Sequence, residues 1–375
     1  MKKVLFVATV VRLHINVFHL PYIQWFHEQG WQVDVAARND FENPEECVIP
    51  YCDHYYNIPF ERSPLKPANL KAMKELKKLI DTEQYDLIHC HTPVGGVAAR
   101  LAASKCRKSG KTKVAYTAHG FHFYTGAPLI NWLFFYPIER ILARKTDLLI
   151  TMNTEDYSRA KKFKAKKVAY VNGVGLDLKR FIPLKEKEKE SIREELHLDK
   201  EDVFAITVGN LIKRKDQSTL IEAVNKLDNP HFHLFICGDG QCYDELKKAA
   251  SDLGISSQVH LLGFRKDVDK LCGAADIFLF ASLQEGLPVA VMEAMACGLP
   301  IVASKIRGNS DLIDNGKGGY LVRPTDADGF AKAIVYVIRD RKKAERMENY
   351  NFKKIKEYSK EKVMEQMAEL YESLM

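Results

Sequence analysis

The chain has 375 residues, of which 46% are hydrophobic and 28% are charged, and its formal net charge is +7. This length exceeds the size at which a single hydrophobic core stops growing, so we expect two domains with a cleft between them. The composition is that of a soluble globular protein, and no apolar run approaches the roughly 18 residues that cross a bilayer, which excludes an integral membrane protein.

The N-terminal run Met1 to Ala8 resembles a signal peptide only superficially. Its apolar character breaks at Arg12 and His14, and no small-residue cleavage site follows. We therefore interpret it as the first strand of a cytoplasmic protein. The eight cysteines include no C-x-x-C pair, and several lie in apolar patterns, which indicates reduced thiols that pack as small hydrophobic groups.

Short β-rich runs alternate with helical patterns along the chain, and this alternation predicts parallel α/β sheets. A charged stretch, 185–190, lacks apolar periodicity and separates two series of such runs, so the domain boundary is expected within 175–198. We predict an α/β fold of two facing, doubly wound domains, 1–180 and 190–350. The predicted strands are 4–9, 32–36, 87–90, 114–118, 148–151 and 168–171 in the first half, and 204–208, 233–237, 259–262, 277–280 and 301–303 in the second.

Basic residues gather in two clusters of the first half, which run from Arg100 to Lys113 and from Lys161 to Lys167. No nucleic-acid motif accompanies them, so a nucleic-acid partner is not predicted. A solvated face and a contact with an anionic membrane surface remain alternatives. The aromatic run Trp132 to Tyr136 is open to two interpretations as well, a place in the core, which is favoured, or an approach to the bilayer.

In open parallel sheets ligands bind beyond the carboxyl ends of the strands. In the first half, His91 follows the strand 87–90 and His119 follows 114–118. A lone histidine is more often packed or solvated than catalytic, although His119 has a glycine neighbour. In the second half, Asn210 and a basic turn that contains Arg214 and Lys215 follow the strand 204–208, and such a turn suits a diphosphate.

The segment 282–300 is the most informative part of the sequence. Pro288 fits the first position of a helix, and Gly298 with Pro300 fits its end. Glu293 then lies inside this helix, and Glu285 lies in the loop before it.

The start of this helix leaves backbone amides unpaired, and with the helix dipole they can bind an anion such as a diphosphate. A carboxylate beside such an anion-binding site would bind neutral hydroxyl groups and not phosphate. Glu293 therefore suits a ribose diol, and Glu285 suits the group attached to the diphosphate. This is the chemistry of a nucleotide-sugar site. A surface loop with solvated glutamates is the alternative. The predicted anion-binding loop consists of Gly286, Leu287, Pro288 and Val289.

No metal site and no cofactor are predicted. The first strand is not followed by G-x-G-x-x-G, which speaks against a dinucleotide site. The D-x-D tripeptides at Asp267 and Asp326 fit helix starts, where aspartate caps amides. The pairs His89/His91 and His231/His233 lack further ligands in a metal-site pattern and are interpreted as structural.

Several motifs together resemble glycosyltransferase family 4, whose members are retaining enzymes of the GT-B fold with two Rossmann-like domains. The motifs are Val208-Gly-Asn-Leu with Lys215, the Gly263-Phe-Arg turn, the stretch from Glu285-Gly-Leu-Pro to Pro300, and the stretch Asn315 to Val322. The segments 14–21 and 116–128 are similar to bacterial transferases of exopolysaccharide and capsule assembly, the EpsD-like type. The resemblance covers almost the whole chain, and the segment 355–375 resembles the helix that in this fold returns to the first domain.

The resemblance implies a role for each matching residue. Glu285 would lie beside the transferred sugar, Glu293 would bind the ribose hydroxyls, and Lys215 would neutralise the diphosphate. His119 would contact the sugar, and the turn Phe264–Arg265 would receive the nucleobase. Many members have arginine in place of Asn210, so diphosphate binding would rest on Lys215 with help from Lys213 or Arg214. The glycine-rich first loop of the family is absent, and acceptor contacts are assigned to Arg12, His14, Asn16 and His91.

The resulting hypothesis is a metal-independent, retaining hexosyl transfer. The donor would be a nucleotide-diphosphate sugar, with UDP as its nucleotide, and the acceptor a glycan linked to undecaprenyl diphosphate. A nucleotide-sugar epimerase and a non-catalytic scaffold of polysaccharide assembly are the alternatives.

Overall fold

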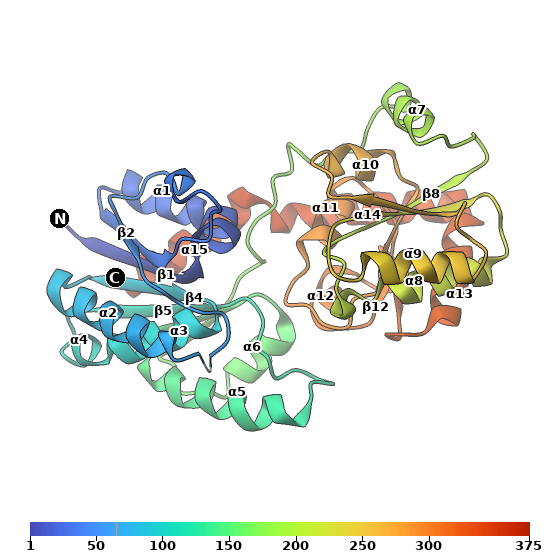
Figure 1. The fold of residues 1–375 in the computed structure, drawn as a ribbon. Helices are drawn as coiled ribbons and strands as arrows, with labels where there is room; N and C mark the ends of the chain where they lie inside the picture. The colour runs from blue at the N-terminus through green and yellow to red at the C-terminus, as the bar shows by residue number, and fades with distance from the viewer. Residues whose placement is uncertain (65) are drawn as a thin grey trace. The chain divides into compact units, whose positions relative to one another are not determined.

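The computed structural model describes residues 1–64 and 66–375, and these residues form two compact units (Figure 1). Unit 1 comprises Met1–Val174 together with Val363–Met375, and unit 2 comprises Gly175–Lys362. Each unit has its own parallel sheet, covered by helices on both faces. This is the doubly wound α/β architecture that the alternation of β-rich and helical runs predicts.

The sheet of unit 1 has seven strands among the described residues, in the order β3-β2-β1-β4-β5-β6-β7, and all neighbours are parallel. Its central strand β4 is buried along its whole length, as expected of a strand between two helical layers. The strands are β1 (Lys3–Val10), β2 (Gln32–Arg38), β3 (His54–Asn57), β4 (Leu87–His91), β5 (Lys113–Ala118), β6 (Leu148–Thr151) and β7 (Lys167–Tyr170).

Two apolar clusters hold this sheet between its helices. One packs α2, α3 and α5 against one face, and the other packs α1 and α15 against the opposite face. The helical segments are η1 (Val11–His19), α1 (Leu20–Glu28), η2 (Pro44–Glu46), α2 (Ala68–Glu83), α3 (Pro93–Ala102), α4 (Ser104–Lys108), α5 (Leu129–Leu142), η3 (Ala143–Lys145), α6 (Thr154–Ala160) and α15 (Lys360–Leu374).

The sheet of unit 2 has six parallel strands in the described part of the chain, in the order β10-β9-β8-β11-β12-β13. Here too the strands that were predicted in the sequence are present, and the charged stretch after residue 185 forms part of a helix, α7. The strands are β8 (Val203–Val208), β9 (Phe232–Cys237), β10 (Val259–Gly263), β11 (Ile277–Phe280), β12 (Ile301–Ser304) and β13 (Gly319–Val322).

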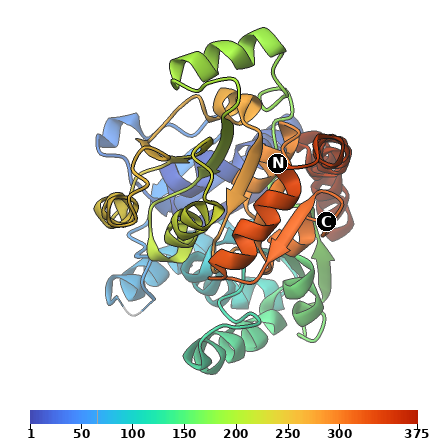
Figure 2. The same cartoon turned by 90° about the vertical axis from the view of Figure 1, so that its right-hand side faces the viewer.

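Helices α8 and α13 lie side by side on one face of this sheet, with α9 beside them (Figure 2). Helices α10 and α11 and the segment η5 cover the other face. The helical segments are α7 (Glu186–Glu195), η4 (Lys213–Lys215), α8 (Gln217–Leu227), α9 (Tyr243–Asp252), α10 (Val268–Ala274), α11 (Val289–Ala296), α12 (Asn309–Leu312), α13 (Ala327–Ile338), α14 (Arg341–Lys354) and η5 (Ile355–Tyr358).

Two details of unit 1 correct the sequence interpretation. Arg100 does not belong to a basic surface, because it is fully buried and forms a bidentate pair with Glu139 at 2.8 and 3.1 Å. The aromatic run on α5 divides between core and surface. Trp132 and Tyr136 pack against the core cluster, whereas Leu133 and Phe134 are exposed.

All eight cysteines belong to the described residues and are free thiols, as the sequence predicts. A search of residues 1–64 and 66–375 for a helix with the length and apolar character of a membrane span finds none.

Candidate functional site

Glycine turns connect the strands of unit 2 to the loops at their carboxyl ends. A Cβ atom on Gly238, which has a φ of +145°, would lie 2.0 Å from the carbonyl oxygen of Gly209, so the turns after β8 and β9 touch through their backbones. Only glycine permits this approach. Asn210, the second residue after β8, is exposed, and its carbonyl oxygen accepts a hydrogen bond from Nε2 of Gln217 at 3.2 Å.

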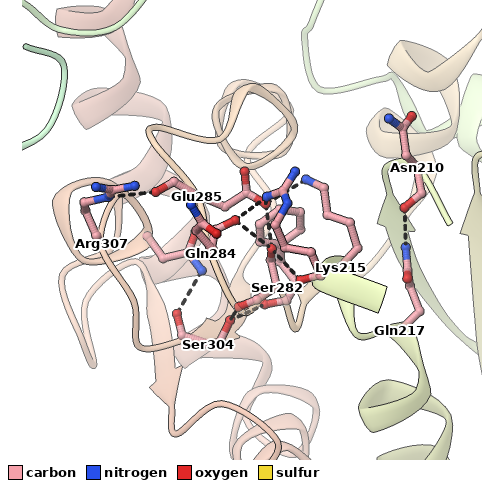
Figure 3. A network of polar contacts seen from close by, with 11 residues as sticks. Asn210, Lys215, Gln217, Ser282, Gln284, Glu285, Ser304 and Arg307 are labelled. Atoms are coloured by element: carbon pink, nitrogen blue, oxygen red, sulfur yellow. Dashed lines mark hydrogen bonds and ion pairs between the residues drawn. The ribbon is translucent and has the colours of Figure 1, made fainter. Parts of the chain in front are cut away.

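The loop after β11 carries Glu285, and this carboxylate is held by three donors (Figure 3). Its Oε1 atom lies 2.8 Å from Nζ of Lys215, 3.1 Å from Nη1 of Arg214 and 2.6 Å from Oγ of Ser282. The side chains of Lys215 and Glu285 are only 15% and 10% exposed. The structure thus brings together Lys215 and Glu285, which lie 70 positions apart in the sequence.

These three contacts all reach one oxygen of Glu285, Oε1. The backbone of the loop is held as well, because Nε of the buried Arg307 donates to the carbonyl oxygen of Glu285 at 2.9 Å. Sequence reasoning missed Ser282 and Arg307. The positions directly after β11 and β12 were the available signal, since residues at strand ends face the same edge of the sheet.

Helix α11 follows this loop and begins at Val289, so Pro288 is its N-cap residue. The prediction that Pro288 is the first helical residue is therefore wrong by one position. The side chain of the N-cap residue makes no hydrogen bond to the start of the helix. Gly298 follows the end of the helix with a φ of +79°, in agreement with the predicted stop.

Glu293 lies inside α11, as predicted, and is largely buried. Burial raises the pKa of its carboxyl group to about 7, and the charge of Asp269 acts in the same direction, while Arg180 opposes both. The carboxyl group therefore ionises less readily than that of an ordinary surface glutamate.

The turn after β10 presents Phe264, whose side chain is 69% exposed. The next residue, Arg265, binds Asp267 through two hydrogen bonds, Nε to Oδ1 at 2.8 Å and Nη2 to Oδ2 at 2.6 Å. Asp267 precedes α10, but its carboxylate pairs with Arg265 and does not cap the helix, so the capping prediction is wrong here. The prediction is confirmed at Asp326, which accepts a hydrogen bond from the amide of Gly329 at 2.8 Å.

In unit 1, β1 leads directly into η1, a π-helix in place of a glycine-rich loop. The carboxylate of Asp40 binds the amides of Arg12 and Leu13 at 2.6 and 3.3 Å, which fixes the start of η1. The side chain of Arg12 is 44% exposed, and Nδ2 of Asn16 donates to the carbonyl oxygen of Val48 at 3.1 Å.

The π-helix places His14 and His19 on the same side, because residues five apart are neighbours in this geometry. Their ring centroids lie 4.8 Å apart, and His119, which follows β5, lies 4.8 Å from His14. His91, which ends β4, stacks on His19 at 3.7 Å. The structure thus brings together three of the histidines singled out in the sequence with His19, which was not. The sequence offered no reason to pair His14 with His19, because the segment was not recognised as a π-helix.

Burial lowers the pKa of all four imidazoles, that of His119 to about 4. These rings are therefore neutral at physiological pH. His89 lies beside this cluster, with its ring centroid 4.1 Å from that of His91, but both of its ring nitrogens have partners. Nε2 contacts the hydroxyl of Thr117 and Nδ1 contacts that of Tyr371, both at 2.8 Å, as expected of a structural histidine.

Comparison with known proteins assigns the chain to a family. Residues 3–153 match the profile described as "Glycosyl transferase 4-like", and residues 188–354 match "Glycosyl transferases group 1". The putative glycosyltransferase EpsD of Bacillus subtilis (strain 168) is 39% identical over 100% of this chain and 97% of its own length. The chain belongs to glycosyltransferase family 4.

Further relatives of this glycosyltransferase act in the synthesis of bacterial polysaccharides. The UDP-Gal:alpha-D-GlcNAc-diphosphoundecaprenol alpha-1,3-galactosyltransferase of Escherichia coli is 32% identical over 73% of this chain and 71% of that protein. Among solved structures, Anabaena Alr3699/HepE in complex with UDP and glucose covers 100% of both chains, with a TM-score of 0.79 and 20% identity. Sucrose-phosphate synthase from Thermosynechococcus elongatus has the same TM-score and identity over 100% of this chain and 99% of its own. The fold is therefore GT-B.

Proposed function

We propose that this glycosyltransferase moves a hexosyl unit from a UDP-sugar to a lipid-linked glycan acceptor, with net retention at the anomeric carbon, in the assembly of a bacterial exopolysaccharide or capsule. The observation that carries this proposal is the convergence of Lys215 and Arg214 on Glu285 beside the uncapped start of α11. Two similar proteins support it, since the galactosyltransferase of Escherichia coli is named for UDP-Gal and a diphosphoundecaprenol acceptor, and Anabaena HepE forms a complex with UDP.

In this proposal the diphosphate lies between the basic turn and α11. Two cations, Lys215 and Arg214, and the first amides of α11 surround the position where negative charge develops as the diphosphate leaves. Electrostatic stabilisation of this kind is often the largest catalytic term, so the reaction needs no metal ion. Asn210 stands where many family members have arginine. It offers the diphosphate a neutral hydrogen-bonding group, so the compensating positive charge comes from Lys215.

The remaining donor contacts follow from the same placement. Glu293 accepts hydrogen bonds from the ribose hydroxyls, and Oε2 of Glu285 accepts one from the transferred sugar. The exposed ring of Phe264 offers a stacking surface to the nucleobase. His119 is assigned a role toward the transferred sugar, and Arg12, His14, Asn16 and His91 are assigned a role toward the acceptor.

No enzymatic nucleophile is assigned, and retention then requires attack from the face that the diphosphate leaves. The acceptor oxygen forms its bond to the anomeric carbon as the bond to the diphosphate oxygen breaks, and the acceptor proton passes to the leaving diphosphate. Product analysis by NMR tests this, because the configuration at the anomeric carbon can be compared with that of the donor.

The donor site is tested by calorimetric titration with UDP, with GDP and NAD as comparisons. We expect selective binding of UDP, and we expect Lys215→Ala to weaken it and to lower the transfer rate by about 100- to 1,000-fold, the usual loss when one preorganised donor is removed. Lys226→Ala is the matched control, because Lys226 forms an exposed pair with Asp328 at 3.0 Å. Unchanged UDP binding in Lys215→Ala would remove the assigned role, and conversion of the donor without an acceptor would identify an epimerase.

We further propose that unit 1 contacts the inner face of the plasma membrane through α5. This helix exposes a row of large apolar side chains, and Arg140 and Arg144 near its end are exposed and basic. An apolar helix face flanked by cations suits an anionic bilayer, where a lipid-linked acceptor resides. The exposed apolar residues are Leu129, Ile130, Leu133, Phe134, Ile138 and Ile141.

Cosedimentation with vesicles tests this contact. We expect binding to vesicles that contain phosphatidylglycerol and its loss in Leu133→Glu. Leu70→Glu on α2 is the matched control, because both leucines are 63% exposed. Equal binding by both variants would exclude α5 as the contact.

A further inference from the structure

In the cluster of His14, His19, His91 and His119 in unit 1, six of the eight ring nitrogens are buried without a hydrogen-bond partner among the described residues. No described protein group binds Nε2 of His14, Nε2 of His119 or either ring nitrogen of His19 and His91, although all six atoms are buried. A buried polar atom without a partner costs about 1–3 kcal/mol. Such groups are rare in native structures, and six of them in one place indicate a ligand that pairs with them.

Three of these imidazoles are arranged as a set of metal ligands. One ring nitrogen from each of His14, His19 and His119 lies within 4.8 Å of the other two. Ligand nitrogens around a tetrahedral ion are about 3.4 Å apart, given metal–nitrogen bonds of about 2.1 Å, so binding requires the ring nitrogens to approach one another by up to about 1.4 Å.

We propose that His14, His19 and His119 bind a transition-metal ion of the Zn²⁺ class. The set contains three imidazoles and no carboxylate, which suits Zn²⁺ and its neighbours and disfavours Mg²⁺ and Ca²⁺, the cations that prefer oxygen ligands. His91 is a positioning residue, because its ring stacks on that of His19.

Three protein ligands leave a fourth position open to water or to a hydroxyl group. The site itself does not depend on the catalytic proposal, but one consequence rests on it. An imidazole of His119 that binds the ion cannot contact the donor sugar, so occupancy of this site would lower the rate of transfer.

Titration of the full-length, chelator-treated protein with Co²⁺ and Zn²⁺ tests the proposal. We expect intense visible absorption from four-coordinate Co²⁺, its displacement by Zn²⁺, and a loss of affinity of roughly 100-fold in His14→Ala and in His119→Gln. Circular dichroism of each variant verifies its fold, and the second variant keeps the test valid if the first does not fold.

Two controls separate this site from other histidines. His27→Ala removes an exposed imidazole of unit 1, and His231→Ala removes one that pairs with Asp202 in unit 2. Both should bind Co²⁺ as the wild type does. No binding, binding that survives both His14→Ala and His119→Gln, or binding lost in a control would overturn the proposal. A UDP titration of the same samples distinguishes its failure from failure of the donor site.

Discussion

Glu293→Gln is expected to stabilise the protein at alkaline pH and to have little effect at acidic pH. The carboxyl group of Glu293 lies in α11, where burial raises its pKa from 4.5 to about 7. The unfolded chain ionises this group near its ordinary pKa, whereas the folded protein resists ionisation. The group therefore does not lower the free energy of unfolding below pH 4.5. As the pH rises from 4.5 to 7, the stability of the folded state falls.

The size of this effect follows from the difference between the two pKa values. A rise from 4.5 to about 7 corresponds to about 3 kcal/mol of unfolding free energy lost above pH 7. Glutamine has nearly the same shape and does not ionise. The stability of Glu293→Gln relative to the wild type should therefore be about 2–3 kcal/mol higher at pH 8 than at pH 4.5.

Thermal unfolding of both proteins, measured at the two pH values, gives this difference. Glu245→Gln on α9 serves as a control for the loss of one exposed negative charge. If the difference in Tm between wild type and Glu293→Gln is the same at pH 4.5 and pH 8, the burial argument is wrong. The same variant tests the donor site, because losing a charged hydrogen bond to the ribose should weaken UDP binding by about 10- to 100-fold.

Three further substitutions test the packing of the units. Gly238→Ala places a Cβ atom 2.0 Å from a backbone carbonyl oxygen and should lower stability by several kcal/mol, measured by denaturant unfolding. Arg100→Met leaves the buried carboxylate of Glu139 unpaired and should lower the free energy of unfolding by about 3–5 kcal/mol. The double variant Arg100→Met/Glu139→Leu should recover much of this loss, and equal losses in the two variants would contradict the argument. Tyr371→Phe removes the 2.8 Å contact with His89 and should cost about 1–3 kcal/mol, whereas unchanged unfolding of unit 1 would show that the contact is unimportant.

The sequence predicts the buried strands well because two helical layers impose a simple pattern on them. The run 277–280 is wholly apolar, the run 87–91 is apolar except for His89 and His91, and both are buried throughout. The strands that were missed, β3 and β13, are four residues long and lie at sheet edges. An edge strand pairs with one neighbouring strand and has a half-exposed surface, so its hydrophobic pattern in the sequence is weak.

The candidate site was predictable where one residue or one local segment carries the signal. Glu285 and Glu293 stand out because a loop and a helix start lie beside them in the sequence. The ion pair of Glu285 with Lys215 was not predictable, because it depends on the register of β8 and β11. The histidine cluster required the π-helical geometry of η1, which local sequence patterns do not reveal. The ligand contacts assigned to these residues stay predictions.

The discontinuity of unit 1 has a consequence for the order of folding. Residues 363–375 follow the whole of unit 2 in the sequence, yet Tyr371 is only 1% exposed and packs against Trp25 and Phe26 in the core of unit 1. During synthesis from the N-terminus, all of unit 2 therefore leaves the ribosome before the core of unit 1 can close. Unit 2 can fold from contiguous chain, whereas unit 1 keeps an apolar surface around α1 open until the last helix docks.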